Sequence, residues 1–180
     1  MKTKATLGAL LLVVTMTHAQ TYTDNAEVTN GSEILEEIEL SPQVLANLGI
    51  GSVVNPRNAT LQGNSVFLTQ IGDYNVASVT VFAKASEISL TQRGDENFAG
   101  LDYDVKTVIS DIKQEGNRNT VYDIVKNKNA DISLELEQNG NDLNFQRLGS
   151  NSLTQSLQFK QTEASPSLVI RSSTYGTIDN

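Results

Sequence analysis

Glutamine is the residue whose type and spacing could do chemistry in this sequence. It recurs at Gln70, Gln92, Gln114, Gln138 and Gln161, with spacings of 22, 22, 24 and 23 residues. A side-chain amide both donates and accepts hydrogen bonds, so amides held in one row can each bond to the next, as in the ladders of cross-β structure. The spacing therefore predicts amide stacking in a fold that repeats every 22–24 residues.

The residues of most enzyme chemistry are missing from the predicted mature chain. Lys2 and Lys4 precede the apolar run 5–16, and Thr17-His18-Ala19 has the small residues that a signal peptidase needs. We expect a signal peptide over 1–19, cleaved between Ala19 and Gln20. Cleavage removes the one His, and the chain has no Cys and no Trp. This composition excludes Ser-His or Cys-His nucleophiles and Cys/His zinc sites, so no enzyme activity and no cofactor are expected.

Charge and hydropathy narrow the possible partners. Without Lys2 and Lys4 the chain keeps 11 basic and 21 acidic side chains, a net charge of −10. An acidic surface disfavours nucleic acid and anionic lipid as partners. The apolar run of 12 residues is short for a membrane span, which needs about 20. We therefore expect an exported protein with no membrane span and no nucleic-acid partner.

Glycine and asparagine accompany the glutamines at nearly constant offsets. A glycine follows two residues later in four units, at Gly72, Gly94, Gly116 and Gly140. An asparagine follows three residues after the glycine at Asn75, Asn97 and Asn119, and one residue later than that at Asn144. The fifth unit has Glu163 and Pro166 at these places. Gly tolerates positive φ, and Asn can adopt the left-handed region or bond its own backbone, so each Gly-x-x-Asn predicts a turn.

The segments on either side of each turn alternate between apolar and polar residues. Before the glutamine the apolar pairs are Val66 and Leu68, Ile88 and Leu90, Leu134 and Leu136, and Leu157 and Phe159, whereas the third unit has Ser110 and Ile112. A period of two marks a strand with one buried face. Each unit is thus predicted to be strand, turn, strand, with its glutamine on the inward face.

One such unit cannot bury its own inner face, but stacked copies can. Strands that pair about 4.8 Å apart place equivalent residues in columns. The sequence therefore predicts an all-β fold, a β-solenoid of about five stacked strand–turn–strand rungs with amyloid-like cross-β order. A buried amide without partners costs about 1–3 kcal/mol, whereas a ladder satisfies the five glutamines and fixes the register.

The repeat resembles the curlin repeat, the unit of the bacterial functional amyloid called curli. Its pattern is Ser, five residues, Gln-x-Gly-x-x-Asn-x-Ala, three residues, Gln. The second unit matches it at Ser86, Gln92, Gly94, Asn97 and Ala99, and the likeness covers about 63–172. Asn64 replaces the leading Ser in the first unit, and Val81, Tyr103 and Val125 replace the trailing Gln. The chain thus resembles a divergent curlin with four to five repeats, possessing one glutamine ladder where the family has two.

The resemblance implies a secreted structural subunit that self-assembles head to tail into extracellular curli-like amyloid fibres. Expected partners are further copies of the chain, another curlin subunit and the outer-membrane curli secretion pore. The expected location is the surface of a Gram-negative-type cell, in the biofilm matrix, where the fibres serve adhesion. Both the major and the minor, nucleating, subunit type are compatible with the repeats. The family also suggests that the degenerate fifth unit holds the protein at the cell surface, the alternative being a cap or a frayed end.

Other organisational features complete the expectations. Residues 20–62 are not repeat-like and are predicted to be a leader or targeting segment, and Ser41-Pro42 predicts the start of a short helix that a glycine ends. Residues 63–172 form the predicted solenoid and 173–180 a C-terminal tail. No strong helical cap precedes the first rung, so we expect an uncapped stack with like ends that can continue into a filament.

Two competing functions remain on sequence grounds. One is a β-helix that acts on polysaccharide, although the loops between units are only a few residues long. The other is a monomeric solenoid adhesin or ice-binding module, which would need a flat array of Thr on one face, whereas only Thr69 and Thr91 align. The turn carboxylates Asp73, Asp95 and Asp142 are single rather than clustered, so no metal site is predicted.

Overall fold

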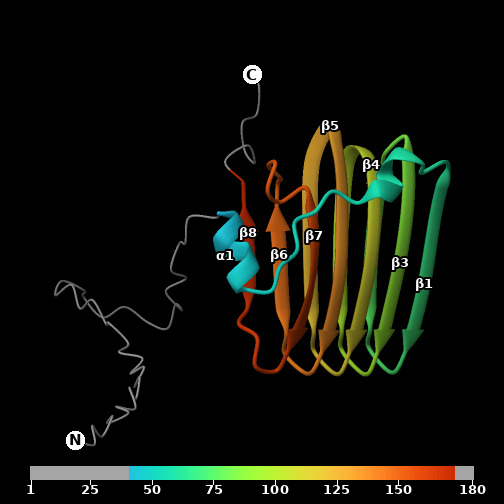
Figure 1. The fold of residues 1–180 in the computed structure, drawn as a ribbon. Helices are drawn as coiled ribbons and strands as arrows, with labels where there is room; N and C mark the ends of the chain where they lie inside the picture. Colours follow the sequence, from blue (N-terminus) through green and yellow to red (C-terminus); the bar gives the residue numbers. More distant parts are fainter. Residues whose placement is uncertain (1–40, 173–180) are drawn as a thin grey trace, which may run out of the picture. The chain divides into compact units, whose positions relative to one another are not determined.

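The protein is described by a computed structural model over residues 41–172 (Figure 1). The predicted signal peptide with its Ala19–Gln20 cleavage site, the first half of the leader and the tail 173–180 lie outside the described residues. Within the described part, no helix has the length and apolar character needed to cross a membrane.

Eight strands make up the repeat region of the described residues. The strands are β1 (Asn64–Ile71), β2 (Val76–Phe82), β3 (Ala85–Arg93), β4 (Phe98–Glu115), β5 (Thr120–Asn139), β6 (Asn144–Leu148), β7 (Ser156–Thr162) and β8 (Leu168–Arg171). β4 and β5 continue around a bend, so each contributes to two successive rungs. This gives five rungs, over residues 64–82, 85–105, 107–127, 131–148 and 156–171, and confirms the predicted β-solenoid.

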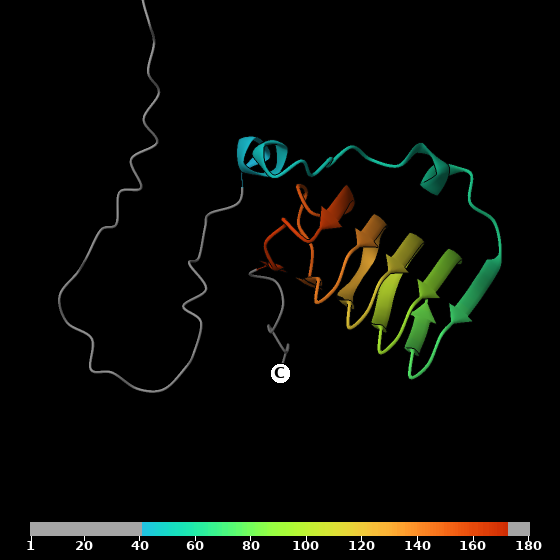
Figure 2. The ribbon, with the colours of Figure 1, turned by 90° about the horizontal axis from the view of Figure 1, so that it is seen from below.

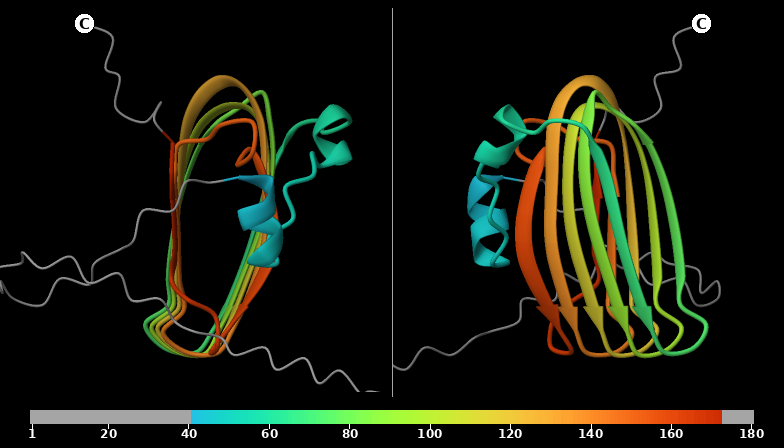
Figure 3. Two further views of the ribbon diagram at one scale, coloured as in Figure 1. Left: turned by 60° about the vertical axis from the view of Figure 1, so that its left-hand side comes forward. Right: turned by 90° about the vertical axis from the view of Figure 1, so that its right-hand side faces the viewer.

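All strand pairs between rungs are parallel, and the rungs superimpose when seen along the stack (Figure 3). One wall is formed by β1, β3, the second halves of β4 and β5, and β7. The other wall is formed by β2, the first halves of β4 and β5, β6 and β8. Figure 2 shows successive rungs side by side, joined by turns along one margin. Side chains between the two walls form the core.

The inward positions form columns that run through the rungs. In the first wall Val66, Ile88, Ser110, Leu134 and Leu157 share one column, and Leu68, Leu90, Ile112, Leu136 and Phe159 share the next. The interior aliphatic members are almost fully buried, from 0% to 2% exposed. Burying such a side chain contributes about 1.5–3 kcal/mol, so the columns supply the main apolar stabilisation of the stack.

The two-residue expansion of the fourth unit lies in the bend and not in the turn. Val105 pairs with Asn127 across 22 residues, whereas Thr107 pairs with Asp131 across 24. The extra residues are therefore accommodated where β5 passes from one wall to the other. A bend can absorb an insertion without shifting the register of either wall, and this is why the spacing varies while the columns stay aligned.

Residues 41–63, which include the second half of the predicted leader, pack against the solenoid. The helix α1 (Pro42–Asn47) begins after the N-cap Ser41 and is followed by Gly49 at φ 71°, as the sequence predicted. Leu45 and Ile50 are buried in the core cluster. After the helix the chain crosses the outside of the first wall to the short 3-10 helix η1 (Pro56–Ala59) and then enters β1 (Figures 1 and 3).

Two buried amides attach this crossing segment to the wall. Asn58 Nδ2 donates to Thr107 Oγ1 at 2.9 Å and to the carbonyl of Ile132 at 3.0 Å. Asn55 Nδ2 donates to Glu135 Oε1 at 2.8 Å. The segment therefore touches rungs three and four before the chain starts rung one.

Candidate assembly site

The five predicted glutamines lie in one continuous row inside the solenoid. Each Nε2 donates to the Oε1 of the glutamine in the next rung, from Gln70 to Gln161, at 2.7, 2.8, 2.9 and 2.9 Å. Every glutamine after the first also donates its second amide hydrogen to a backbone carbonyl of the preceding rung, at 3.0–3.2 Å. The three interior amides are fully buried and fully bonded. The row is thus a directional chain of hydrogen bonds.

A second row forms from the turn asparagines. Asn75 Oδ1 accepts from the backbone and the side-chain amide of Asn97, at 3.0 and 3.1 Å. Asn97 Oδ1 in turn accepts from the backbone N–H of Asn119 at 3.0 Å. The Nδ2 groups of all three donate to the turn carbonyls of Gly94, Gly116 and Gly140 at 2.7–2.8 Å. These amides bond neighbouring rungs to each other, and Asn75 Nδ2 also donates across its own turn to the carbonyl of Ile71 at 3.4 Å.

Asn144 does not belong to this row, contrary to the sequence alignment. Its strand partner is Thr120, and the residue opposite Asn119 is Leu143, whose backbone N–H donates to Asn119 Oδ1 at 3.0 Å. The fourth turn has the same length as the others, because its extra residues lie in the bend. The amide row therefore ends at Asn119, and Asn144 contributes only its backbone carbonyl, to Gln161.

The turns need glycine for contact as well as for conformation. A Cβ placed on Gly72, Gly94 or Gly116 would lie 2.1, 2.2 or 1.9 Å from the carbonyl oxygen of the next turn glycine. Besides the glycine, each turn has one residue at positive φ, with values of 57–59° at Tyr74, Glu96, Arg118 and Asp142. This residue precedes the Asn in the first three turns and Leu143 in the fourth, so the Asn does not itself adopt the left-handed region. The asparagine is thereby free to reach the next rung.

The turn acids bond to the backbone and to neighbouring side chains. Asp95 Oδ1 accepts the N–H of Asp73 at 2.8 Å, and Asn117 and Asn141 repeat this bond in the following rungs. Asp142 forms a bidentate pair with Arg118 at 2.7 and 2.8 Å. Over residues 41–172, no group of three or more His, Cys, Asp or Glu side chains is arranged to hold a metal ion.

A buried ion pair lies in the core, and sequence reasoning missed it. Arg147 of rung four and Asp123 of rung three are both fully buried and form a bidentate pair, with both N···O distances at 2.7 Å. Arg147 Nη1 also donates to the carbonyl of Thr154 at 2.8 Å. The sequence did contain a sign of this pair, because Asp123 lies between Val121 and Val125 at the period of two that marks inward positions.

Tyr103 and Ser110 complete this polar cluster. The hydroxyl of Tyr103 donates to Asp123 Oδ2 and lies 3.1 Å from Ser110 Oγ. Burial, together with the negative charge of Asp123, holds the pKa of Tyr103 well above its usual value, so the phenol stays protonated. Tyr103 occupies the place of the trailing glutamine in the repeat, and Ser110 occupies a position that is aliphatic in the other rungs. Both departures from the pattern are explained by the ion pair.

These features define the class of protein as a parallel β-solenoid whose rungs are joined by internal amide rows. Within it, residues 62–94 match the family model of the curlin associated repeat. This match supports the assignment of the chain to the curlin family. No curated protein and no solved structure matches the chain.

Proposed function

We propose that the protein is a secreted structural subunit of extracellular curli-like cross-β fibres. The observation that carries the proposal is the glutamine row together with the open rung at its start. The row supplies one hydrogen bond per rung along the stacking axis, which is the axis along which a cross-β fibre grows. A rung from another chain added to that end would extend the row and both walls.

The remaining parts of this proposal follow the family. Curlin-type subunits imply export through the outer-membrane curli pore and assembly at the cell surface, in the biofilm matrix, in contact with another curlin subunit. The predicted signal peptide 1–19 supports export, and the mature net charge of −10 supports solubility before assembly. The proposal covers both the major and the nucleating type of subunit, and it includes assembly of the chain with copies of itself.

The test uses the purified protein in two samples, alone and mixed with a synthetic peptide of residues 85–105, the sequence of rung two. Fibres are examined by X-ray diffraction for the 4.7–4.8 Å spacing of cross-β structure and by electron microscopy with gold-labelled antibody against the protein. We expect the protein to be built into fibres in at least one sample. A protein that stays soluble in both, while the peptide assembles without it, contradicts the proposal.

A further inference from the structure

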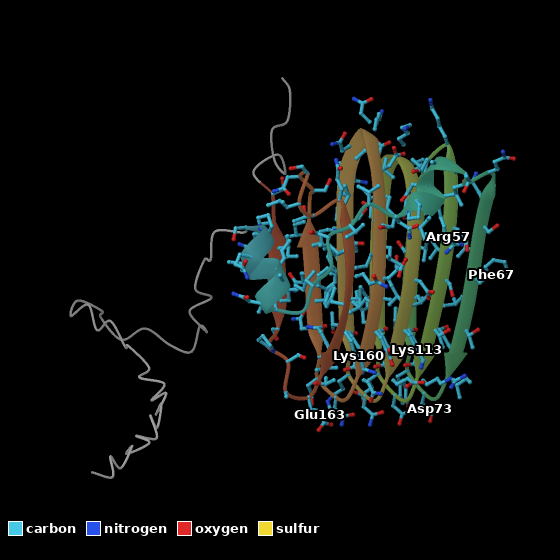
Figure 4. All side chains as sticks on the ribbon, in the orientation of Figure 1. Arg57, Phe67, Asp73, Lys113, Lys160 and Glu163 are labelled. Carbon is cyan, nitrogen blue, oxygen red and sulfur yellow. The ribbon has the colours of Figure 1, made fainter. Side chains whose placement is uncertain are left out.

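The two ends of the solenoid are not alike, which corrects the expectation of like ends. Rung one exposes the interior column, since Val66 and Leu68 are 53% and 51% exposed while the equivalent residues of rung two are buried. Neither β1 nor β2 contains a charged residue, although soluble proteins usually protect free edges with charge. Phe67 lies at this edge and Glu163 near the opposite end of the row of turns (Figure 4). Rung one is therefore an unprotected edge.

The glutamine row is also polar, and only its first end is free. From Gln70 to Gln138 each Nε2 donates to the Oε1 of the following rung, so Gln70 is left with an Oε1 that accepts no hydrogen bond from any described residue. At the other end Gln161 Nε2 donates to the carbonyls of Asn144 and Pro166, at 3.0 and 3.2 Å. The amide hydrogen that would reach a sixth rung is thus already bonded to Pro166.

The backbone edge of rung five is closed by the segment after α1. Gly51 and Gln158 exchange two backbone hydrogen bonds of 2.8 Å in an antiparallel bridge on the free side of β7. Leu48 and Ile50 line a small pocket with Phe159, the last member of its core column. A further rung would have to displace this segment before it could pair with β7. The fifth turn is also altered, because Glu163 replaces the glycine on which turns stack.

The turn geometry specifies what could dock on rung one. In the first three turns, a Cβ added to the glycine would lie 1.9–2.2 Å from the carbonyl oxygen of the following turn. A rung placed before rung one must therefore have Gly at this position, since any Cβ would collide with the carbonyl of Gly72. It must also offer a free glutamine amide hydrogen to Gln70 Oε1.

We infer that the rung-one end is the docking surface for the last rung of a different β-solenoid chain. That rung has a glutamine with a free amide hydrogen and a turn glycine. The chain's own fifth rung has neither, so a second capped copy does not fit. Two rung-one ends placed face to face would oppose two acceptor oxygens. This inference rests on the proposed function and adds that the protein joins a fibre through one end only.

The test measures binding of a fluorescein-labelled peptide of residues 85–105 to the full-length protein by fluorescence anisotropy. We expect saturable binding of one peptide per chain. Changing Gly94→Ala in the peptide should abolish binding, because the added Cβ would face the carbonyl of Gly72. The control change Glu87→Gln, on the outward face, should leave binding unaltered. In the protein, Gln70→Ala should weaken binding about two- to tenfold, the range that one hydrogen bond supplies.

The outcomes distinguish docking of the peptide on rung one from docking on rung five. A peptide docked on rung five would present its glycine to solvent, so undiminished binding of the Gly94→Ala peptide overturns the inference. Absence of any binding overturns it as well. Fibres grown from the purified protein alone would also overturn it, because they require the fifth rung to accept a copy, yet they would leave the proposed function standing. Gold label restricted to fibre ends in the mixed sample supports both.

Discussion

The buried ion pair gives the sharpest test of how the core is held together. Replacing Arg147 by Leu leaves the Asp123 carboxylate in the core with only the Tyr103 hydroxyl as a described side-chain partner. Removing one member of a buried pair typically costs about 3–5 kcal/mol, because the other charge stays buried and unpaired. Small domains are stable by only about 5–15 kcal/mol, so Arg147→Leu should remove about a fifth or more of the free energy of unfolding.

The chain contains a matched control for this change. Arg118 and Asp142 form the same bidentate pair, also 24 residues apart and also at 2.7 Å, but their side chains are 54% and 63% exposed. Solvent screens an exposed pair, so Arg118→Leu should change the free energy of unfolding far less than Arg147→Leu. Urea unfolding followed by circular dichroism measures both variants under conditions in which the protein is soluble.

A double variant separates the charge from the space that it fills. Asp123→Leu with Arg147→Leu places leucine at both charged positions of a column whose other members are Val79, Leu101 and Ile170, so the column becomes apolar throughout. Replacing both partners by apolar residues is often neutral or stabilising, although here the carbonyl of Thr154 loses its Arg donor. We expect the double variant to be more stable than Arg147→Leu alone. The reasoning fails if Arg147→Leu lowers the free energy of unfolding no more than Arg118→Leu does. It also fails if the loss in the double variant equals the sum of the losses in Asp123→Leu and Arg147→Leu.

Three further predictions concern the rows, the turns and pH. Gln92→Ala removes a partner from the amides of Gln70 and Gln114, and each unpartnered amide should lower the free energy of unfolding by about 1–3 kcal/mol. Gln62→Ala, which is exposed and outside the row, should have little effect in the same urea assay. Gly94→Ala should abolish the fold as judged by circular dichroism, because its Cβ would lie 2.2 Å from a carbonyl oxygen, while Gly63→Ala, with positive φ but nothing within 4 Å, should only destabilise it. The pKa of Tyr103 is raised by burial and by Asp123, so stability should be intact below the unfolded value of about 10 and fall as pH rises above it, less steeply in Tyr103→Phe.

Much of the solenoid could be predicted because each rung repeats a local pattern. Alternation assigned the inward faces, and the regular spacing of glutamine and glycine assigned the rungs, since stacking requires equivalent residues to coincide. Asn144 was misplaced because the sequence shows that a unit has two extra residues but not where they lie. Only the pairing of Val105 with Asn127 and of Thr107 with Asp131 places the insertion in the bend.

The packing of residues 41–63 on the solenoid and the buried ion pair depend on contacts between distant segments, which local patterns do not encode. Gly51 pairs with Gln158 and Asn58 with Ile132, and nothing in residues 41–63 repeats or alternates to indicate this. Asp123 could be placed inward from its neighbours, but its partner could not be identified. Asp102 also has a basic residue 24 positions later, Lys126, and that pair lies on the surface.

The ion pair also solves a problem that the glutamine row creates. A row of identical amides fixes the register within a rung, but a shift of one whole rung would bond glutamine to glutamine just as well. Asp123 and Arg147 occur once each in their column, between Leu101 and Ile170, so a shifted stack would set the buried Asp or Arg against an aliphatic residue. At several kcal/mol for each unpaired buried charge, such a stack is strongly disfavoured. The amides thus set the register along each strand, and the single charged pair sets the order of the rungs.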